Sequence, residues 1–320
     1  MKAVVFTRYG SPDVLQLTEV DRPLPKDDQV LVKVSAASVN ALDRHGLHRS
    51  IVGNGFWKPK DQRVGVDLAG QVEAIGGTVT QFQPGDEVYG IGSGAFAEYA
   101  AARETAVAMK PKTVSFEAAA AVPVAALTAL QGLRDKGQIQ PGEHVLISGA
   151  TGGVGTFAVQ IAKALGAQVT AICSTNKVGL VQSLGADNVL DYTQVDVTRQ
   201  GQRYDLILAV NGYHSIFAYR RILRSDGRYV LAGEGSNTHL FRAVLQALIL
   251  GRVLSRTGKQ KMSFFIADPN QKDLAFLSEL LESGKVIPVI DRCYPLSETA
   301  DAFRYLEQGH AKGKVVITVD

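Results

Sequence analysis

The chain has 320 residues, a length typical of about two domains. Hydrophobic residues make up 46% of it and charged residues 20%, which is the composition of an ordinary globular protein and excludes a disordered chain or a coiled coil. Its 34 basic and 31 acidic residues leave a net charge of +3, and no basic run or RNA-binding motif favours a nucleic-acid partner.

The N-terminal sequence begins directly with strand-like residues and lacks the apolar core and cleavage site of a secretory signal. No stretch approaches the roughly 18 uninterrupted apolar residues of a membrane span. The only cysteines, Cys173 and Cys293, are too few for a disulfide framework or a structural zinc site. We therefore expect a cytoplasmic protein with two reduced thiols.

Residues 1–121 predict an antiparallel, barrel-like β domain, because β-rich stretches alternate there with turns that contain glycine and proline. Arg44–Arg63 has no clear period and contains glycines, two histidines and a tryptophan. We expect it to be an irregular loop, and loops of that length are often functional. The expected strands are Ala3–Phe6, Val30–Val34, Ala69–Ile75 and Glu87–Tyr89.

From Val122 onward strands alternate with amphipathic helices, a pattern typical of a doubly wound parallel sheet. We expect residues 122–267 to form this second domain and residues 268–320 to return to the first. The expected strands are Val145–Ser148, Gln168–Ile172, Asn188–Leu190, Leu206–Val210, Tyr229–Ala232, Val286–Ile290 and Lys314–Val319. The expected helices are Gly155–Leu165, Lys177–Leu184, one through Arg220–Leu223, Lys272–Glu282 and Glu298–Gln308.

The strongest local motif is the glycine-rich turn at residues 149–155, Gly-Ala-Thr-Gly-Gly-Val-Gly, between an expected strand and an expected helix. Glycines let the backbone turn sharply and approach a pyrophosphate, whose charge is favoured at a helix N-terminus. Against the pattern G-x-G-x-x-G, Ala150 replaces the first glycine, while Gly152 and Gly155 hold the other two places. The motif predicts a nicotinamide dinucleotide site; the alternative is a merely tight turn.

The end of the following strand favours NADP(H) over NAD(H). NAD-selective sites usually place Asp or Glu about 20 residues beyond the glycines, to hold the ribose hydroxyls. Residues 173–177 here read Cys-Ser-Thr-Asn-Lys, and the first carboxylate is Asp187. Hydroxyls and Lys177 suit a 2′-phosphate, because they form charge-assisted hydrogen bonds. Alternatively, Ser174 or Thr175 caps the next helix.

Several motifs in order along the whole chain resemble those of the medium-chain dehydrogenase/reductase superfamily, and most of all its zinc-independent quinone oxidoreductase and enone reductase branch, the zeta-crystallin-like proteins. The resemblance implies a GroES-like antiparallel β-barrel catalytic domain and a Rossmann cofactor domain. It rests on Ala-Ala-Ser-Val-Asn40-Ala-Leu-Asp43, Gly65-Val-Asp67-Leu-Ala-Gly70-Gln-Val-Glu, Pro84-Gly-Asp86-Glu-Val-Tyr, Ala-Val-Pro123-Val-Ala-Ala-Leu-Thr128-Ala, the glycine turn, and Gly309-His-Ala-Lys-Gly-Lys314-Val-Val.

The same resemblance implies that no metal is bound. Zinc-dependent members place Cys where this chain has Asn40, and Gly-His-Glu where it has Gly65-Val66-Asp67; they also carry a four-cysteine lobe after the region of Phe96. None of these ligands is present, so a tetrahedral Cys/His site cannot form. Without a Lewis acid, oxidation of an alcohol loses several kcal/mol of transition-state stabilisation.

The implied activity is hydride transfer from NADPH to an activated acceptor: an enone, an alkenal or a quinone. The alternative is an NADPH-binding accessory or membrane-associated protein with weak or vestigial quinone reductase activity. The feature that favours this alternative is the apolar stretch Leu240–Leu254, which is followed by basic residues and could form a helix on a membrane surface. Peripheral membrane contact is not favoured, because a helix beside the cleft or at a subunit interface explains the stretch as well.

The resemblance places Asn40 and Asp43 in the loop that faces the nicotinamide, and Asn40 is expected to hold the substrate oxygen or to position the nicotinamide. No residue stands out as the proton donor: Asp43, His45 and His48 are candidates by proximity, with water an equal competitor. The edge strand Met262–Ile266 is expected to pair with its two-fold mate in a homodimer. The expected cofactor contacts are Thr128, Ala150, Gly152, Gly153, Val154, Gly155, Ser174, Lys177, Tyr192, Asn211, Gly233, Phe265 and Lys314.

Overall fold

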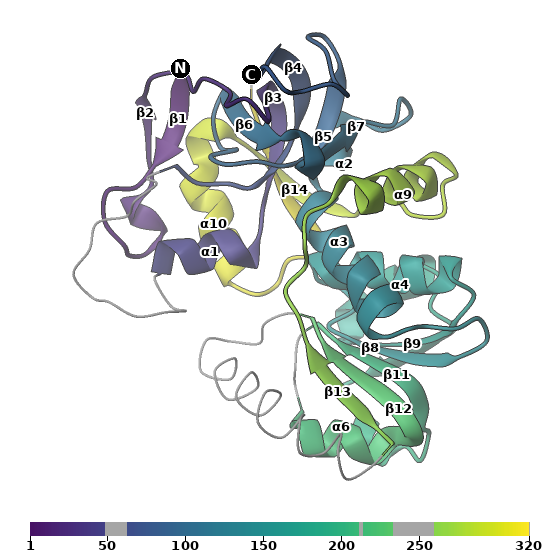
Figure 1. Cartoon of the computed structure of the whole chain (residues 1–320). Helices are drawn as coiled ribbons and strands as arrows, with labels where there is room; N and C mark the ends of the chain where they lie inside the picture. Colours follow the sequence, from purple (N-terminus) through teal and green to yellow (C-terminus); the bar gives the residue numbers. More distant parts are fainter. Residues whose placement is uncertain (49–62, 211–213, 233–258, 320) are drawn as a thin grey trace. The chain divides into compact units, whose positions relative to one another are not determined.

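A computed structural model describes residues 1–48, 63–210, 214–232 and 259–319 (Figure 1). It divides into two compact units. The first comprises Met1–Ala125, Pro269–Gly284 and Pro288–Asp320, and the second comprises Ala126–Asp268 and Lys285–Ile287. The chain passes from the first unit to the second inside helix α3 (Pro123–Gln131), a few residues after the change that the sequence places at Val122.

The first unit is built on an antiparallel sheet in the order β14-β15-β3-β4-β5-β7, in which only β14 and β15 are parallel neighbours. Its central strand is β3, which is longer than the sequence predicted and curls across the sheet. Residues Gln29–Lys33 of β3 pair with β6, whereas Ala36–Val39 pair with β15. The strands are β3 (Gln29–Val39), β4 (Asp67–Ile75), β5 (Glu87–Ile91), β6 (Tyr99–Arg103), β7 (Val107–Met109), β14 (Ile290–Pro295) and β15 (Lys314–Thr318).

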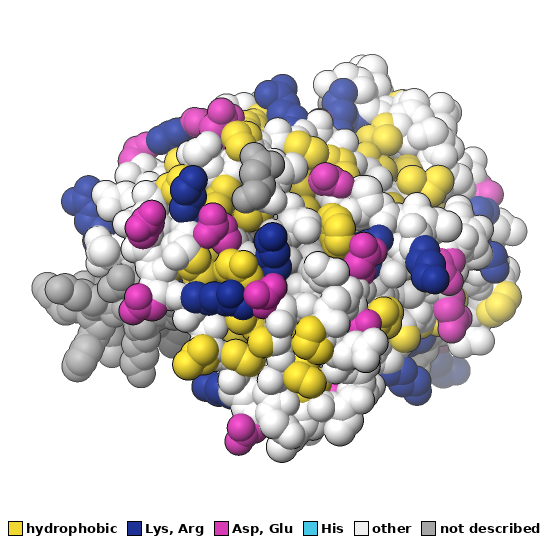
Figure 2. Space-filling model, turned by 90° about the horizontal axis from the view of Figure 1, so that it is seen from above, with side chains coloured by type: hydrophobic (Ala, Val, Ile, Leu, Met, Phe, Trp, Pro, Cys, Tyr) yellow, Lys and Arg dark blue, Asp and Glu magenta, His cyan; other side chains and the backbone are white. Residues whose placement is uncertain are grey.

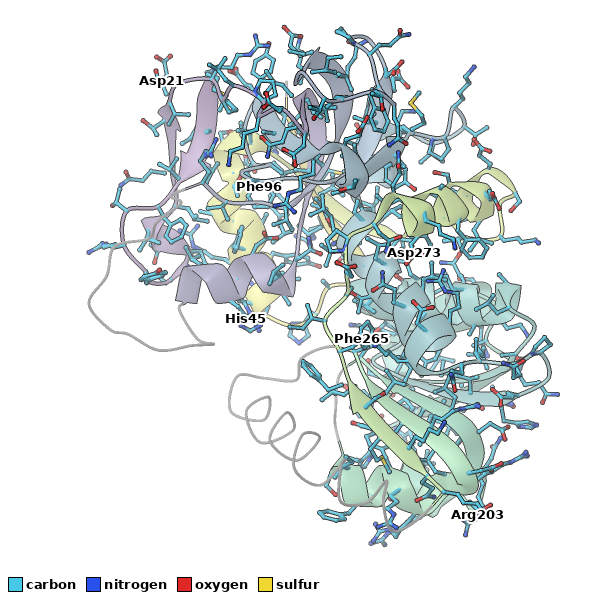
Figure 3. The ribbon with its side chains drawn as sticks, in the orientation of Figure 1. Asp21, His45, Phe96, Arg203, Phe265 and Asp273 are labelled. Atoms are coloured by element: carbon cyan, nitrogen blue, oxygen red, sulfur yellow. The ribbon has the colours of Figure 1, made fainter. Side chains whose placement is uncertain are left out.

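Alternating β-branched residues of β3, among them Val30, Val32 and Val34, point into one buried core. Phe96 and Phe303 meet there edge to face, with ring centroids 5.9 Å apart (Phe96 is labelled in Figure 3). Around this core lie a two-stranded ribbon, β1 (Lys2–Val5) and β2 (Gln16–Glu19), and helices α1 (Ala41–His48), α2 (Phe116–Ala120), α9 (Gln271–Glu282) and α10 (Thr299–Glu307).

The second unit is a parallel sheet in the order β10-β9-β8-β11-β12-β13. This is the doubly wound order that binds dinucleotides at the carboxyl ends of the strands, where the order reverses. Central strands such as Val145–Ile147 are buried on both faces, which explains their continuous apolar sequence. The elements are β8 (His144–Ser148), α4 (Gly153–Ala164), β9 (Gln168–Cys173), α5 (Val178–Ser183), β10 (Asn188–Asp191), β11 (Tyr204–Ala209), α6 (Ile216–Ile222), β12 (Leu223–Leu231) and β13 (Lys261–Phe264).

Two expectations about local structure were wrong. The start of the expected loop Arg44–Arg63 belongs to helix α1, because the Asp43 carboxylate in the first turn accepts a hydrogen bond from the Asn40 N–H and stabilises the helix start; residues 49–62 lie outside the described residues. The expected strand Val286–Ile290 is replaced by β14, which begins at its last residue. The backbone of Ile287 bonds instead to the side chain of Gln160, with its N–H 2.8 Å from Oε1 and its carbonyl 3.0 Å from Nε2.

Candidate active site and cofactor site

A cluster of polar side chains is buried in the first unit where three strand ends meet. Ser38, near the end of β3, is the register partner of Asp67, the first residue of β4. Lys314, the first residue of β15, lies beside the end of β3. The exposed fraction is 0% for Asp67, 3% for Lys314 and 6% for both Asn40 and Asp43. Burial of so many polar groups requires that they satisfy one another.

Asp67 is the hub of this cluster. Its Oδ2 accepts hydrogen bonds from Ser38 Oγ at 2.8 Å and Asn40 Nδ2 at 2.9 Å, and forms an ion pair with Lys314 Nζ at 3.4 Å. Its Oδ1 accepts from the backbone N–H of Val124, at the start of α3, at 2.9 Å. Four donors therefore compensate a carboxylate that has no contact with water.

Asn40 connects Asp67 to Lys314. Its Oδ1 accepts from Lys314 Nζ at 2.5 Å, while its Nδ2 donates to Asp67 and to the Ser38 carbonyl at 3.2 Å. An amide has two N–H donors, and both are engaged inside the protein. In this arrangement Asn40 orients the ion pair, and the role expected from the sequence, to hold the substrate oxygen or to position the nicotinamide, stays a prediction.

Asp43 sits in the first turn of α1, where its Oδ2 accepts from the backbone N–H of Asn40 at 2.8 Å. This is one half of a capping box, and it explains why a helix begins here. Burial raises the pKa of Asp43 to about 7, the Asn40 N–H opposes that rise, and the negative charge of Asp67 adds to it. Asp43 therefore exchanges a proton near neutral pH.

His45 belongs to the same helix and is 7% exposed, so it is a buried helix residue and not a loop residue (Figure 3). The side chain of His48 lies outside the described residues. Burial lowers the pKa of Lys314, and the negative charges of Asp67 and Asp43 oppose this shift. Lys314, which the resemblance places at the cleft edge as a cofactor contact, donates from Nζ to Asn40 and lies 3.4 Å from Asp67; its contact with a cofactor stays a prediction.

The cluster does not fit a zinc ion. Its positive charge is already supplied by Lys314, whose Nζ contacts the side chains of Asn40 and Asp67, two of the positions where zinc-dependent enzymes carry other residues. Within the described residues, no group of three or more His, Cys, Asp or Glu side chains could hold a metal ion. Tetrahedral zinc needs thiolate, imidazole or carboxylate donors around an open centre.

The glycine turn of the second unit follows β8 and leads into α4. Gly149 has a φ of +78°, a left-handed conformation that favours glycine, so it makes the sharp turn expected of the first glycine of the pattern. Ala150, which stands at the place of the first glycine when Gly152 and Gly155 hold the other two, follows this turn directly. Gly152 caps α4, and a Cβ on Gly155 would come within 2.0 Å of the Gly149 carbonyl oxygen. The close strand–helix packing requires both Gly149 and Gly155.

Gly153 and Val154 are the first two residues of α4. The first N–H groups of a helix have no acceptor within the helix, and they attract anions. Ala150 is fully buried, and its N–H donates to the Ile172 carbonyl of β9 at 3.3 Å. The turn is thus fixed to the sheet, while the helix start presents backbone donors suited to a pyrophosphate.

Ser174, Lys177 and Tyr192 lie at the carboxyl ends of neighbouring strands, since β9 and β10 are parallel and paired. Tyr192 is 40% exposed, and its N–H donates to the Cys173 carbonyl at 3.1 Å. Ser174 precedes a short 3-10 turn, Thr175–Lys177, but its side chain makes no capping bond; its Oγ donates to Asn176 Oδ1 at 2.8 Å. The capping alternative therefore does not account for Ser174.

Two further expected cofactor residues lie elsewhere in the second unit. Thr128 is half-buried in α3, and Phe265 follows β13 (Figure 3). The Phe265 ring lies close to Gly132, where an added Cβ would come within 3.3 Å of it. Asn211 and Gly233 lie outside the described residues, as does the stretch Leu240–Leu254.

Comparison with known proteins identifies the family of the chain. Residues 26–112 match the family "Alcohol dehydrogenase GroES-like domain" and residues 184–317 match "Zinc-binding dehydrogenase". The chain is 36% identical over 336 residues to a 2-methylene-furan-3-one reductase of Solanum lycopersicum, an alignment that covers 99% of this chain and 79% of that protein. The chain belongs to the medium-chain dehydrogenase/reductase superfamily.

Other members of the superfamily are similarly related. An NADPH-dependent alkenal/one oxidoreductase of Arabidopsis thaliana is 34% identical over 99% of this chain and 79% of its own length. The solved structure of a quinone oxidoreductase from Coxiella burnetii superposes with a TM-score of 0.87 at 29% identity, covering 100% of this chain and 99% of that one. As a member of this superfamily, the chain is an NAD(P)-binding oxidoreductase with a GroES-like and a Rossmann-like domain, as the sequence predicted.

On the face drawn in Figure 2, Lys and Arg side chains are interspersed with Asp and Glu side chains. No helix in the part of the chain that the structure describes is both long and apolar enough to span a bilayer. Relatives are named as chloroplastic or mitochondrial, so family membership does not assign the cytoplasmic location expected from the sequence.

Sequence reasoning assigned no role to three residues that organise these sites: Ser38, Asp67 and Gly149. All three lie inside or beside motifs that it quoted. Asp67 stands where zinc-dependent relatives carry a glutamate. A carboxylate at this position in a chain that lacks the zinc ligands indicates that the carboxylate has another partner. Gly149 is the only glycine directly after β8, where the sharp turn must be made.

Proposed function

We propose that this chain is a metal-independent, NADPH-dependent reductase of α,β-unsaturated carbonyl compounds or quinones. The observation that carries the proposal is the ion pair of Lys314 with Asp67, which fills the polar cluster with a fixed ammonium. An acceptor reduced here is not activated by a metal ion. It must therefore be made electrophilic by its own structure, as in a conjugated enone or a quinone ring. Relatives named alkenal/one oxidoreductase, furanone reductase and quinone oxidoreductase support the same substrate class.

Reduction of a conjugated double bond consumes a hydride and a proton. A bound NADPH supplies the hydride, and the glycine turn and the residues at the ends of β9 and β10 are the part of the chain suited to hold it. Asp43, with its pKa raised to about 7, is a candidate for holding the proton on Oδ1, since its Oδ2 accepts from the Asn40 N–H. His45 and water remain the other candidates.

The direct test is a steady-state screen of the purified protein with NADPH against alkenals, cyclic enones and quinones, in the presence and absence of a chelator. We expect turnover of at least one acceptor class, unchanged by the chelator. Oxidation of a simple alcohol with NADP⁺ is the matched control reaction, and we expect it to be absent. Alcohol oxidation that requires added zinc would overturn the proposal.

Lys177→Ala is expected to weaken NADPH binding while leaving NADH binding nearly unchanged. A lysine–phosphate contact is charge-assisted but partly screened by solvent, so it contributes roughly 1–3 kcal/mol, or about 5- to 150-fold in Kd. Added salt should weaken NADPH binding less in the variant than in the wild type. The measurement is paired Kd values for both cofactors, with Lys136→Ala as an exposed lysine control in the same unit. Equal weakening of both cofactors would make Lys177 a structural residue.

The proposal includes a homodimer through β13, which is the edge strand of the sheet among the described strands. An apolar sheet edge that is neither paired nor covered invites association. Sedimentation at micromolar concentration should therefore give twice the mass of one chain. A monodisperse monomer would contradict this part of the proposal. Relatives named as reductases and oxidoreductases support the enzyme over the alternative, an accessory or membrane-associated protein.

A further inference from the structure

Two turns at the carboxyl end of the second unit's sheet are tied together by one carboxylate. Asp191, the last residue of β10, is the register partner of Cys173, the last residue of β9. Its Oδ2 accepts a hydrogen bond from Thr175 Oγ1 at 2.5 Å. Its Oδ1 accepts from the N–H of Thr193 at 2.9 Å and from Thr193 Oγ1 at 2.7 Å. The two threonine hydroxyls also lie 2.9 Å apart.

This tether links the residues that the proposed function assigns to NADPH. Thr175 stands between Ser174 and Lys177 in the turn after β9, and Tyr192 stands between Asp191 and Thr193 in the turn after β10. Outside the tether, the backbone link between the turns is the bond from the Tyr192 N–H to the Cys173 carbonyl. Thr175 and Thr193 are exposed, so water can solvate the two turns in several conformations. The tether selects one of these conformations, at a cost in conformational entropy.

We propose that Asp191 and Thr175 are positioning residues for NADPH: their hydrogen bond holds the turn at Ser174 and Lys177 in the arrangement that receives the 2′-phosphate. This inference rests on the proposed NADPH preference. It explains why the Asp191 carboxylate lies near the expected phosphate site. A negative charge there without hydrogen-bond donors of its own would oppose binding of the 2′-phosphate.

The hydrogen bonds of Asp191 support a holding role over direct contact with a ribose. A carboxylate has about four lone-pair positions, and donors of the protein already occupy three of them here. The bond from Thr175 lowers the pKa of Asp191, as do the bonds from Thr193, so the group is an anion at neutral pH. Because most of the acceptor positions of Asp191 are taken by donors in the two turns, few remain for a hydrogen bond from the 2′-hydroxyl of NADH.

The chain contains a matched control five residues further along. Asp196 makes the same local motif, because its Oδ1 accepts from the N–H of Thr198 at 2.9 Å and from Thr198 Oγ1 at 2.6 Å. That motif caps the short 3-10 turn Val197–Arg199. A threonine-to-valine change at 198 therefore removes a similar local bond without touching the turn at Ser174.

The experiment compares Kd values for NADPH and NADH in the wild type, Thr175→Val, Thr175→Ser and Thr198→Val, by quenching of intrinsic fluorescence. Thr175→Val is expected to raise the Kd for NADPH about 3- to 10-fold, the effect of one exposed hydrogen bond to a charged group, and the Kd for NADH less than about 2-fold. Thr175→Ser keeps the hydroxyl and should restore the wild-type values. Thr198→Val should leave both Kd values unchanged.

The outcomes separate this inference from the proposed function. A wild type that prefers NADH defeats the proposed cofactor preference, whatever the variants do. A wild type that prefers NADPH, with a Thr175→Val variant that weakens both cofactors equally or neither, overturns the tether alone. Failure of Thr175→Ser to rescue has the same meaning. Should Thr175→Val melt more than a few degrees below the wild type, Thr175→Ala removes the hydroxyl without putting a methyl group in its position and takes its place.

Discussion

Replacing Lys314 with methionine is expected to lower the free energy of unfolding by about 3–5 kcal/mol, the loss typical of breaking a buried ion pair by removing one partner. Methionine keeps most of the volume of the side chain but leaves Asp67 buried without its counter-charge and Asn40 Oδ1 without its donor. Three other donors to Asp67 remain, which favours the lower end of that range. Urea unfolding at neutral pH measures the difference.

Lys110→Met is the matched control for this prediction. Lys110 is as buried as Lys314, with 5% of its side chain exposed, but its partner Glu87 is 49% exposed and can be solvated when the lysine is lost. We expect its loss of stability to be less than half as large. The double variant Asp67→Asn/Lys314→Met should lose less than the sum of the single variants, because neither charge is then left alone. Strict additivity would contradict the ion pair.

Asp43→Asn is expected to stabilise the protein at pH 8 and to leave its stability almost unchanged at pH 4. The pKa of Asp43 is 3.8 in an unfolded chain and about 7 in the folded one. Between these values the unfolded state releases a proton that the folded state holds, so the wild type loses stability as the pH rises through this window. Three pH units at about 1.4 kcal/mol each set an upper limit of about 4 kcal/mol.

Asparagine suits this test because it resembles a protonated aspartate and its Oδ1 can still accept from the Asn40 N–H. The measurement is the difference in unfolding free energy between variant and wild type at several pH values from 4 to 8. Asp86→Asn is the control, since Asp86 Oδ2 also caps a turn, accepting from the Gln83 N–H at 2.9 Å, but is only half-buried. A gain at Asp43 that does not grow with pH would show that the carboxyl is not shifted.

The cofactor half of the molecule was largely predictable because its signals are local. The strand, the glycine turn and helix α4 are consecutive in sequence, and the turn chemistry and apolar periods are visible within about 20 residues. The glycine pattern did not single out Gly149, because its positive φ belongs to the residue directly after β8, one place before the pattern begins.

The polar cluster could not be predicted in the same way. Lys314 and Asp67 are 247 residues apart, and they meet only because β15 and β4 both pair with β3. No local sequence pattern predicts the register between β3 and β4 that places Ser38 opposite Asp67. Helix α1 was missed because its start depends on the capping bond of Asp43 and not on an apolar period. Asn40 was expected to donate to a substrate, but no local pattern could predict that Ser38 and Asp67 accept from both of its amide hydrogens.

The long separation of Lys314 from Asp67 has a consequence for the order in which the chain folds during synthesis. The second unit is nearly continuous in sequence, so it can fold as soon as residues 126–268 leave the ribosome. The first unit begins to emerge earlier, yet its central strand lacks β15 on one side until residues 314–318 are translated. Until then Asp67 and Asn40 have no Lys314 to contact, so the strands translated first remain incompletely paired.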